Sequence, residues 1–196
     1  MLRLSEMQGG QREKVVVMAP DTDVITKLVI DSRNIVYPSQ SLFFAIKGQL
    51  QDGHHFIGAA YLQGVRNFVV SDEKAVKDYN DINYCLVADV TAFLQSIAIQ
   101  HRAAFPDLTV VGITGSNGKT VVKEWLSYLL SRVHATVKTP KSYNSQIGVA
   151  LSVWGISAEH QMAVFEAGIS TVGEMDKLQK MIRPTLGILT NIGDAH

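Results

Sequence analysis

The chain has 196 residues, of which 46% are hydrophobic and 18% charged, the balance of an ordinary globular protein. Lys and Arg number 18 and Asp and Glu also 18, so no net charge would draw the chain to nucleic acid or to an anionic membrane. No apolar run approaches the roughly 20 residues of a membrane-spanning helix, and the lone Cys85 excludes an internal disulfide. We therefore expect a cytoplasmic protein.

The pattern of the first half of the chain predicts five short strands and two helices. Asp52 is placed to cap a helix over residues 54–62, and Thr91 to cap a longer helix that runs to Ala104. Pro106 interrupts the pattern after the second helix, so we place a domain boundary there. Alternating or buried apolar runs predict the strands, at residues 15–18, 27–30, 42–46, 66–70 and 84–88.

From residue 108 onward strands and helices alternate. The predicted strands are 108–114, 135–139, 162–167 and 185–190, and the predicted helices are 119–131, 146–153 and 173–183. Such alternation favours a parallel sheet with crossover helices, which binds ligands beyond the carboxyl ends of its strands. The sequence therefore predicts an α/β fold with two domains, a small one over 1–106 and a second one with a parallel sheet over 107–196.

The most informative segment joins the strand at 108–114 to the helix that follows it. Gly115 and Gly118 allow a sharp turn whose backbone N–H groups can point at anionic oxygens, and the helix adds the positive end of its dipole. Lys119 can reach terminal phosphates, and the Thr120 hydroxyl is placed to bind Mg²⁺. The segment predicts a polyphosphate site. A glycine-rich turn that binds nothing is the alternative, and the agreement of strand, turn and helix disfavours it.

Two further residues at strand ends are candidate metal ligands. Glu166 follows the apolar run 162–165, at the position where a P-loop protein places a metal-binding acid. His196 follows the last predicted strand, and a neutral imidazole there could bind a divalent metal. The alternatives are a surface carboxylate and a solvated histidine.

Other polar residues could bind a substrate. Asn144 lies in the polar run 141–148, which could position a substrate or phosphate or could be only a capped loop. In the first half, Ser32 and the run 47–49 follow strand ends and could contact an anionic ligand, although each alone is commonplace.

Together, these stretches resemble the Mur ligase family, the ATP-dependent amide-bond ligases of bacterial peptidoglycan synthesis. The resemblance extends from about Leu28 to His196 and is carried by Asp31-Ser32-Arg33, Leu42-Phe43-Phe44-Ala45-Ile46-Lys47-Gly48, Asp52-Gly53-His54, Thr114-Gly115-Ser116-Asn117-Gly118-Lys119-Thr120, Asn144, Ile147-Gly148-Val149, Glu166-Ala167-Gly168, Gly173-Glu174-Met175 and Thr190-Asn191-Ile192-Gly193-Asp194-Ala195-His196. The later motifs are most similar to the MurF type, the UDP-N-acetylmuramoyl-tripeptide–D-alanyl-D-alanine ligases. The run 142–148 further resembles MurF halves fused to alanine racemase.

The resemblance implies roles for individual residues. Lys119, Glu166 and His196 would be catalytic, and Thr120, Glu166 and His196 would bind Mg²⁺. The residues that would bind ATP are Gly115, Ser116, Asn117, Gly118, Lys119, Thr120, Val121 and Asn191. Those that would bind the UDP precursor are Ser32, Lys47, Gly48, Gln49 and Asn144. The family's carbamylated lysine and its C-terminal domain would lie beyond His196, so we expect the chain to be the front portion of a longer protein.

The implied reaction transfers a phosphoryl group from ATP to the peptide carboxylate of UDP-MurNAc-tripeptide. The resulting acyl phosphate is then attacked by the amine of D-Ala-D-Ala. The expected partners are these small molecules, with no nucleic acid and no membrane, and the expected state is a monomer. Three alternatives remain at this point: a MurE-type ligase, a truncated module that binds nucleotide or UDP precursor without activity, and a P-loop switch protein. The absence of a guanine-reading Asn-Lys-x-Asp signature argues against a GTPase switch.

Overall fold

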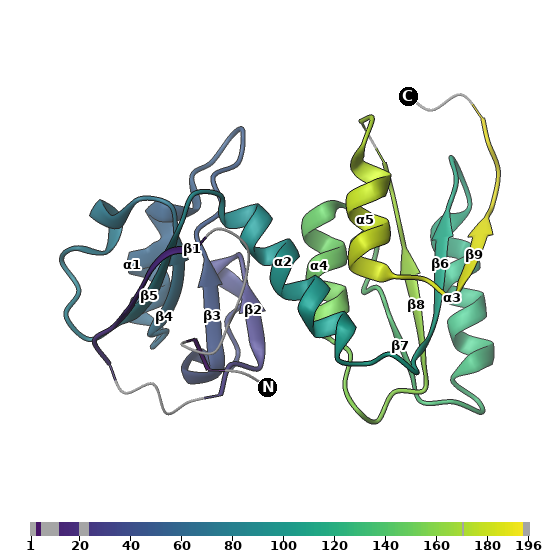
Figure 1. The fold of residues 1–196 in the computed structure, drawn as a ribbon, viewed down its shortest axis with the longest axis horizontal. Helices are drawn as coiled ribbons and strands as arrows, with labels where there is room; N and C mark the ends of the chain where they lie inside the picture. Colours follow the sequence, from purple (N-terminus) through teal and green to yellow (C-terminus); the bar gives the residue numbers. More distant parts are fainter. Residues whose placement is uncertain (1–2, 5–11, 20–23, 170, 194–196) are drawn as a thin grey trace. The chain divides into compact units, whose positions relative to one another are not determined.

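A computed structural model describes residues 3–4, 12–19, 24–169 and 171–193 (Figure 1). The chain forms two compact units, Met1–Ile97 and Ala98–His196. The division falls within helix α2 (Val90–Ala103), nine residues before the boundary expected after Pro106. In the part of the chain that the structure describes, no helix has both the length and the apolar character needed to cross a membrane.

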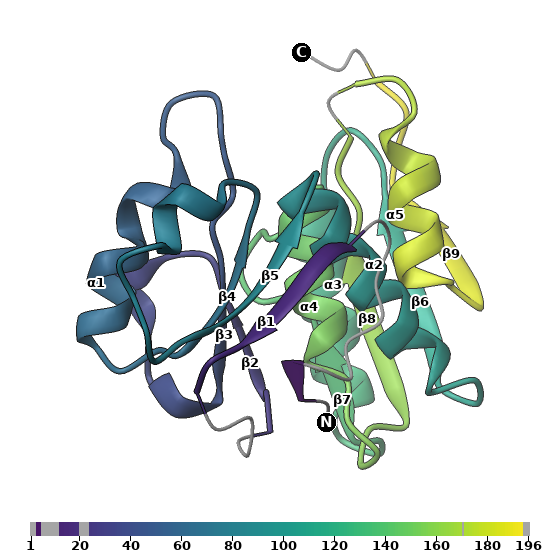
Figure 2. The ribbon, with the colours of Figure 1, turned by 60° about the vertical axis from the view of Figure 1, so that its left-hand side comes forward.

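The first unit is built on a mixed sheet whose strands are ordered β1-β5-β4-β3-β2. Four of the strands pair in parallel, while β1 runs antiparallel to β5 at the edge (Figure 2). The strands are β1 (Arg12–Val17), β2 (Lys27–Val29), β3 (Ser41–Phe44), β4 (Asn67–Val70) and β5 (Asn83–Val87). The predicted strands are thus confirmed to within a few residues.

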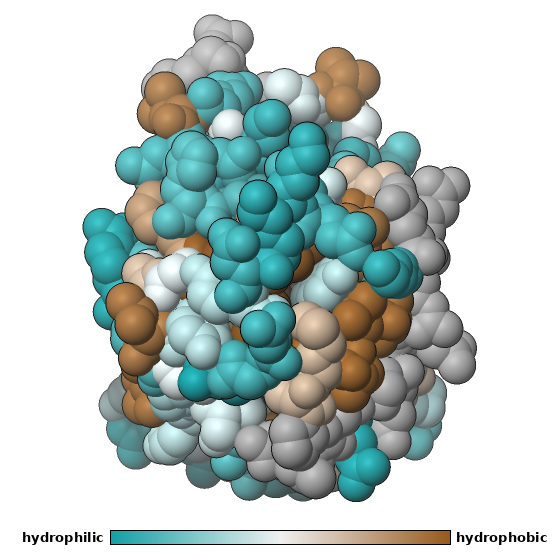
Figure 3. Space-filling view, turned by 90° about the vertical axis from the view of Figure 1, so that its left-hand side faces the viewer, coloured by the Kyte–Doolittle hydropathy of each residue, from teal (hydrophilic) through white to brown (hydrophobic). Residues whose placement is uncertain are grey.

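The core of the first unit lies between this sheet and helix α1 (Ile57–Leu62). Phe43 and Phe68 come from neighbouring parallel strands, are fully buried, and pack edge to face with ring centroids 6.1 Å apart. Ile57 and Ala60 bring the apolar side of α1 onto the same cluster. Hydrophilic side chains cover most of the centre of the face shown in Figure 3.

Aspartates cap several of the helical segments that begin in this unit. Asp31 and Asp52 accept hydrogen bonds from the backbone two residues on and begin 3₁₀ turns at Ser32–Asn34 and Gly53–Phe56. Asp89 caps α2 by accepting from Thr91 N–H at 2.8 Å and Ala92 N–H at 3.0 Å. The prediction that Thr91 itself caps this helix was therefore wrong. A carboxylate two residues earlier reaches the free N–H groups of the first turn.

The second unit has an all-parallel sheet ordered β7-β8-β6-β9. Its strands are β6 (Thr109–Thr114), β7 (Thr136–Lys138), β8 (Met162–Glu166) and β9 (Leu186–Leu189). The helices between them are α3 (Lys119–Leu130), α4 (Gln146–Trp154) and α5 (Glu174–Ile182). This arrangement confirms the predicted α/β class.

The helices cover opposite faces of this sheet. Ile113 packs with Val111 and Val164 against the apolar side of α3. Gly112, which points the other way along β6, faces Ile182 at the end of α5. Because all four strands are parallel, the segments that leave β6, β7, β8 and β9 emerge at one edge, and the site residues predicted within 115–121 and at 144, 166 and 191 lie on these segments.

Candidate nucleotide and metal site

The loop between β6 and α3 has the backbone that a phosphate-binding turn requires. Gly115 has φ +134° and Gly118 has φ +81°, conformations that residues with a side chain rarely adopt. Gly115 is also restricted by space, because a Cβ there would lie 2.2 Å from Thr190 Oγ1. Gly118 immediately precedes α3, so the first N–H groups of that helix, which have no partner within it, open toward the loop.

The segment after β9 is hydrogen-bonded to this loop. Ser116 N–H donates to the Asn191 carbonyl at 3.0 Å, and Asn117 N–H donates to Asn191 Oδ1 at 2.8 Å. The Ser116 hydroxyl donates to the Gly193 carbonyl at 3.0 Å. Asn191, predicted to bind nucleotide, therefore contacts the predicted phosphate loop directly.

Lys119 lies in the first turn of α3, and its ammonium turns back over the loop. Nζ donates to the carbonyls of Gly115 at 2.6 Å and Ser116 at 3.2 Å. These neutral carbonyls are weaker partners than a phosphate oxygen, so an anion in the loop would compete for the ammonium. Val121, also in the first turn, is 55% exposed.

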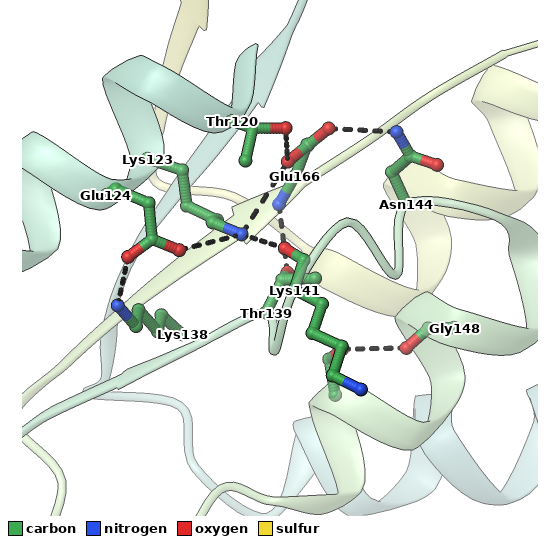
Figure 4. A network of polar contacts seen from close by, with 10 residues as sticks. Thr120, Lys123, Glu124, Lys138, Thr139, Lys141, Asn144, Gly148 and Glu166 are labelled. Atoms are coloured by element: carbon green, nitrogen blue, oxygen red, sulfur yellow. Dashed lines mark hydrogen bonds and ion pairs between the residues drawn. The ribbon is translucent and has the colours of Figure 1, made fainter.

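Glu166 is brought to the same place by the pairing of β6 with β8. It ends β8 opposite Ile113, and its side chain is 1% exposed. Its Oε2 accepts from the Thr120 hydroxyl at 2.9 Å, and its Oε1 accepts from the Asn144 amide at 2.8 Å (Figure 4). Two residues 46 positions apart therefore form one polar centre beside the loop.

This pair of oxygens is close enough for one magnesium ion to contact both. Oxygens bound at about 2.0–2.1 Å in an octahedron lie about 2.9 Å from their neighbours, and Thr120 Oγ1 and Glu166 Oε2 are 2.9 Å apart. Within the described residues, no group of three or more His, Cys, Asp and Glu side chains could hold a metal. An ion here would complete its shell from phosphate oxygens and water, as Mg²⁺ commonly does.

Lys123 is the residue of this centre that sequence reasoning missed. It is fully buried on α3, with Nζ 3.8 Å from Glu166 Oε2 and 3.2 Å from Glu124 Oε1, and it also donates to the Lys141 carbonyl (Figure 4). A signal was present, because residues three apart in a helix share a face and Lys123 follows Thr120 by three.

Asn144 lies in the centre by a different contact from the one predicted. We expected it to bind substrate, and the structure places its amide on Glu166. Its backbone carbonyl accepts from Gly168 N–H at 2.9 Å, just beyond β8. A contact between Asn144 and substrate stays a prediction. So does the metal role of His196, which lies outside the described residues.

The candidate precursor-binding residues of the first unit lie at one edge of its sheet. Ser32 follows β2 and is buried, whereas Lys47, Gly48 and Gln49 are exposed in the loop after β3. Because β2 and β3 are parallel neighbours, both segments leave the sheet at its carboxyl edge. Beside Ser32, hydrogen bonds from Arg33 lower the pKa of Asp31 to about 2, so this pair is charged at neutral pH.

A histidine fixes the loop after β3. Ser71 N–H donates to His54 Nε2 at 3.0 Å, so Nδ1 of the same ring is the donor to Asp52 Oδ1 at 2.6 Å. Hydrogen bonds from the His54 backbone and then from its side chain lower the pKa of Asp52. Lys47 pairs with Asp52 in an isolated bridge, which closes the loop on itself.

Comparison with known proteins identifies the family of the chain. The description "Mur ligase family, catalytic domain" matches residues 24–133, and "Mur ligase middle domain" matches residues 113–196. The chain is 37% identical over 183 residues to the UDP-N-acetylmuramoyl-tripeptide–D-alanyl-D-alanine ligase of Borreliella burgdorferi, covering 88% of this chain and 39% of that protein. It is 30% identical over 200 residues to the enzyme of the same name from Haemophilus influenzae, covering 100% and 42%.

Solved structures agree with these relatives. A crystal structure of MurF from Acinetobacter baumannii superposes with a TM-score of 0.78 at 32% identity, covering 87% of this chain and 36% of that one. The MurF ligase of Thermotoga maritima in complex with ADP gives 0.74 at 31% identity, covering 87% and 38%. The chain therefore spans about two fifths of the length of these relatives. On both the sequence and the fold, the chain belongs to the Mur ligase family.

Proposed function

We propose that the chain is the precursor-binding and nucleotide-binding part of a MurF-type ligase, which joins D-alanyl-D-alanine to UDP-MurNAc-tripeptide at the expense of ATP. The observation that carries the proposal is the contact of the Thr120 hydroxyl with the buried Glu166 carboxylate beside a glycine-rich loop. The relatives reported above bear the name of this ligase. In this proposal residues 1–106 receive the precursor and residues 107–196 bind ATP.

The site residues suit phosphoryl transfer between two anions. An oxygen of the peptide carboxylate attacks the γ-phosphorus of ATP, ADP leaves, and an acyl phosphate is formed. The amine of D-Ala-D-Ala then attacks the acyl carbon, the amide bond forms, the amine loses a proton and inorganic phosphate leaves. Both partners of the first step are negatively charged, so positive charge has to be supplied where they meet.

The described residues can supply that charge. The Lys119 ammonium lies over the loop, and the N–H groups at the start of α3 open toward the same loop. Thr120 and Glu166 would hold Mg²⁺, which when bound neutralises phosphate charge. The protein itself contributes position and electrostatics rather than a covalent step.

The first unit is suited to recognise the other end of the substrate. Ser32 and the run 47–49 lie at one carboxyl edge of its sheet, and Lys47 supplies a cation there. The chain after β3 is held by His54, so the loop that carries Lys47 is fixed before a ligand arrives. A preformed loop loses less conformational entropy on binding.

The test uses the full-length protein. Phosphate release should require UDP-MurNAc-tripeptide together with D-Ala-D-Ala, and Lys119→Ala should abolish it because the ammonium at the γ-phosphate is lost. Turnover with diaminopimelate or lysine on a dipeptide precursor instead would indicate a MurE-type ligase, and turnover retained by Lys119→Ala would refute the site. The sequence of the full-length protein after His196 would show whether an alanine racemase domain follows.

A further inference from the structure

We propose that Lys123 is a positioning residue of the metal site, which holds the Glu166 carboxylate and the segment leading to Asn144 in place for Mg²⁺ and nucleotide. The inference rests on the proposed function, and it assigns a role to a residue outside the phosphate loop. It is drawn from the burial of Lys123, the number of its partners and its place on α3.

The burial of Lys123 is unusual for its residue type. Its side chain is 0% exposed and that of Glu166 is 1% exposed, so the structure keeps two opposite charges away from water. Lysines are almost never fully buried unless they are paired. A core position filled only for packing would take an apolar side chain, so the charge at this position needs a reason.

The ammonium of Lys123 has one hydrogen-bond partner and two ion-pair partners. A lysine ammonium has three N–H donors and no acceptor. Here it faces the carboxylates of Glu166 and Glu124 and the carbonyl of Lys141. These three acceptors come from β8, α3 and the segment after β7, so one ammonium ties three elements together at the carboxyl edge of the sheet.

Both oxygens of the Glu166 carboxylate are contacted by other side chains. Thr120 and Lys123, one turn apart on α3, both contact Oε2, whereas Asn144 contacts Oε1. In Figure 4, Lys123 and Asn144 approach the carboxylate from opposite sides. The Thr120 hydroxyl can therefore turn to a metal ion while Lys123 and Asn144 keep the carboxylate in position.

Lys123 also supports the segment that carries Asn144. Its ammonium binds the carbonyl of Lys141, whose backbone has φ +51°, a conformation uncommon for a residue with a side chain. Asn144 follows three residues later and reaches the other carboxylate oxygen. Loss of the ammonium would therefore loosen the Glu166 carboxylate on both sides.

The test measures nucleotide binding without turnover in the full-length protein. A fluorescent ADP analogue is titrated at a series of Mg²⁺ concentrations, for wild type and for Lys123→Met, which keeps the chain length and removes the charge. We expect the half-saturating Mg²⁺ concentration to rise about 10–100-fold, as when other residues that orient metal ligands are removed. Glu124→Gln is the matched control. It removes a half-exposed partner of the same ammonium, leaves Glu166 paired, and should leave the Mg²⁺ response unchanged.

Two further variants make the test specific. In a Glu166→Gln background, Lys123→Met should cause no additional change, because the two residues act through one carboxylate. Lys123→Arg keeps a positive charge in a different shape and should raise the Mg²⁺ requirement by less than Lys123→Met. If Lys123→Met does not fold, Lys123→Arg is compared with wild type, and a wild-type Mg²⁺ requirement in Lys123→Arg overturns the inference.

The outcomes separate this inference from the proposed function. If wild type binds the ADP analogue without any response to Mg²⁺, the proposed function fails. If wild type responds to Mg²⁺ and the Lys123 variants melt at a lower temperature but keep the wild-type Mg²⁺ response, Lys123 is only structural and the inference is overturned. A tighter Mg²⁺ response in Lys123→Met would overturn it as well.

Discussion

A single methyl group at Gly168 should disturb the metal site without removing any polar side chain. The backbone at Gly168 is not left-handed, so alanine fits its conformation. The added Cβ would lie 2.8 Å from Asn144 Cγ and 2.9 Å from its Nδ2, whereas ordinary contacts begin at 3.4 Å. The Asn144 side chain must therefore retreat by about 0.6 Å.

The displacement of Asn144 costs free energy in two ways, through its hydrogen bond to Glu166 and through overpacking. The Asn144 amide already lies 2.8 Å from Glu166 Oε1, near the short end of the hydrogen-bond range, so it cannot move closer and the bond must lengthen or bend. Overpacking should destabilise the fold by about 1–3 kcal/mol. A hydrogen bond to a charged group contributes about 1.5–3 kcal/mol. If the bond from Asn144 to Glu166 is lost in the metal-bound state, the affinity for Mg²⁺ should fall roughly ten- to hundredfold.

The assay combines a melt with a Mg²⁺ titration of ADP-analogue binding in the full-length protein. We expect Gly168→Ala to raise the half-saturating Mg²⁺ concentration about tenfold or more. In an Asn144→Ala background the new methyl group has room, so the same substitution should change the Mg²⁺ response little further. An unchanged Mg²⁺ response in the single variant, or an equal additional loss in the double variant, would refute the reasoning.

Three other outcomes follow from the same structure. Glu166→Gln keeps the hydrogen bond from Thr120 but removes the charge, so the Mg²⁺ requirement for ligation should rise at least about tenfold, and an unchanged Mg²⁺ titration would remove the residue from the metal site. Ser32→Ala should raise the KM for the UDP precursor more than the KM for ATP in steady-state kinetics, and the reverse pattern would reassign the first unit. Burial holds the pKa of His101 below its usual 6.5. The neutral His101 ring contributes its full stability above pH 6.5, and this contribution declines as the pH falls below that value. Denaturant unfolding should therefore show a free energy of unfolding that falls on acidification in wild type and falls less in His101→Gln.

Much of the second unit could be predicted because its signals are local. The spacing of Gly115, Gly118 and Lys119 determines a turn and a helix start, and both lie within a dozen residues. The meeting of Thr120 with Glu166 also followed from local reasoning, since every parallel strand delivers its carboxyl end to one edge of the sheet. The α/β class rested on the same alternation and is confirmed.

The order of the strands could not be predicted in this way. That β6 lies between β8 and β9, and that β1 joins its sheet antiparallel, depends on pairings between distant segments. Periodicity shows which face of α3 turns inward, but it does not show what lies across from that face, so Lys123 was not recognised. The partner of Asn144 was missed for the same reason, because a polar run before a helix predicts a cap or a ligand contact equally well.

The hydrogen bonds between the phosphate loop and the chain after β9 have a consequence for ligand binding. Asn117 can offer its N–H to a phosphate oxygen only after Asn191 has withdrawn its side-chain oxygen from that group. A ligand that took this N–H would leave the Asn191 side-chain oxygen without that partner. The segment after β9 therefore competes with any anionic ligand for a backbone donor of the loop.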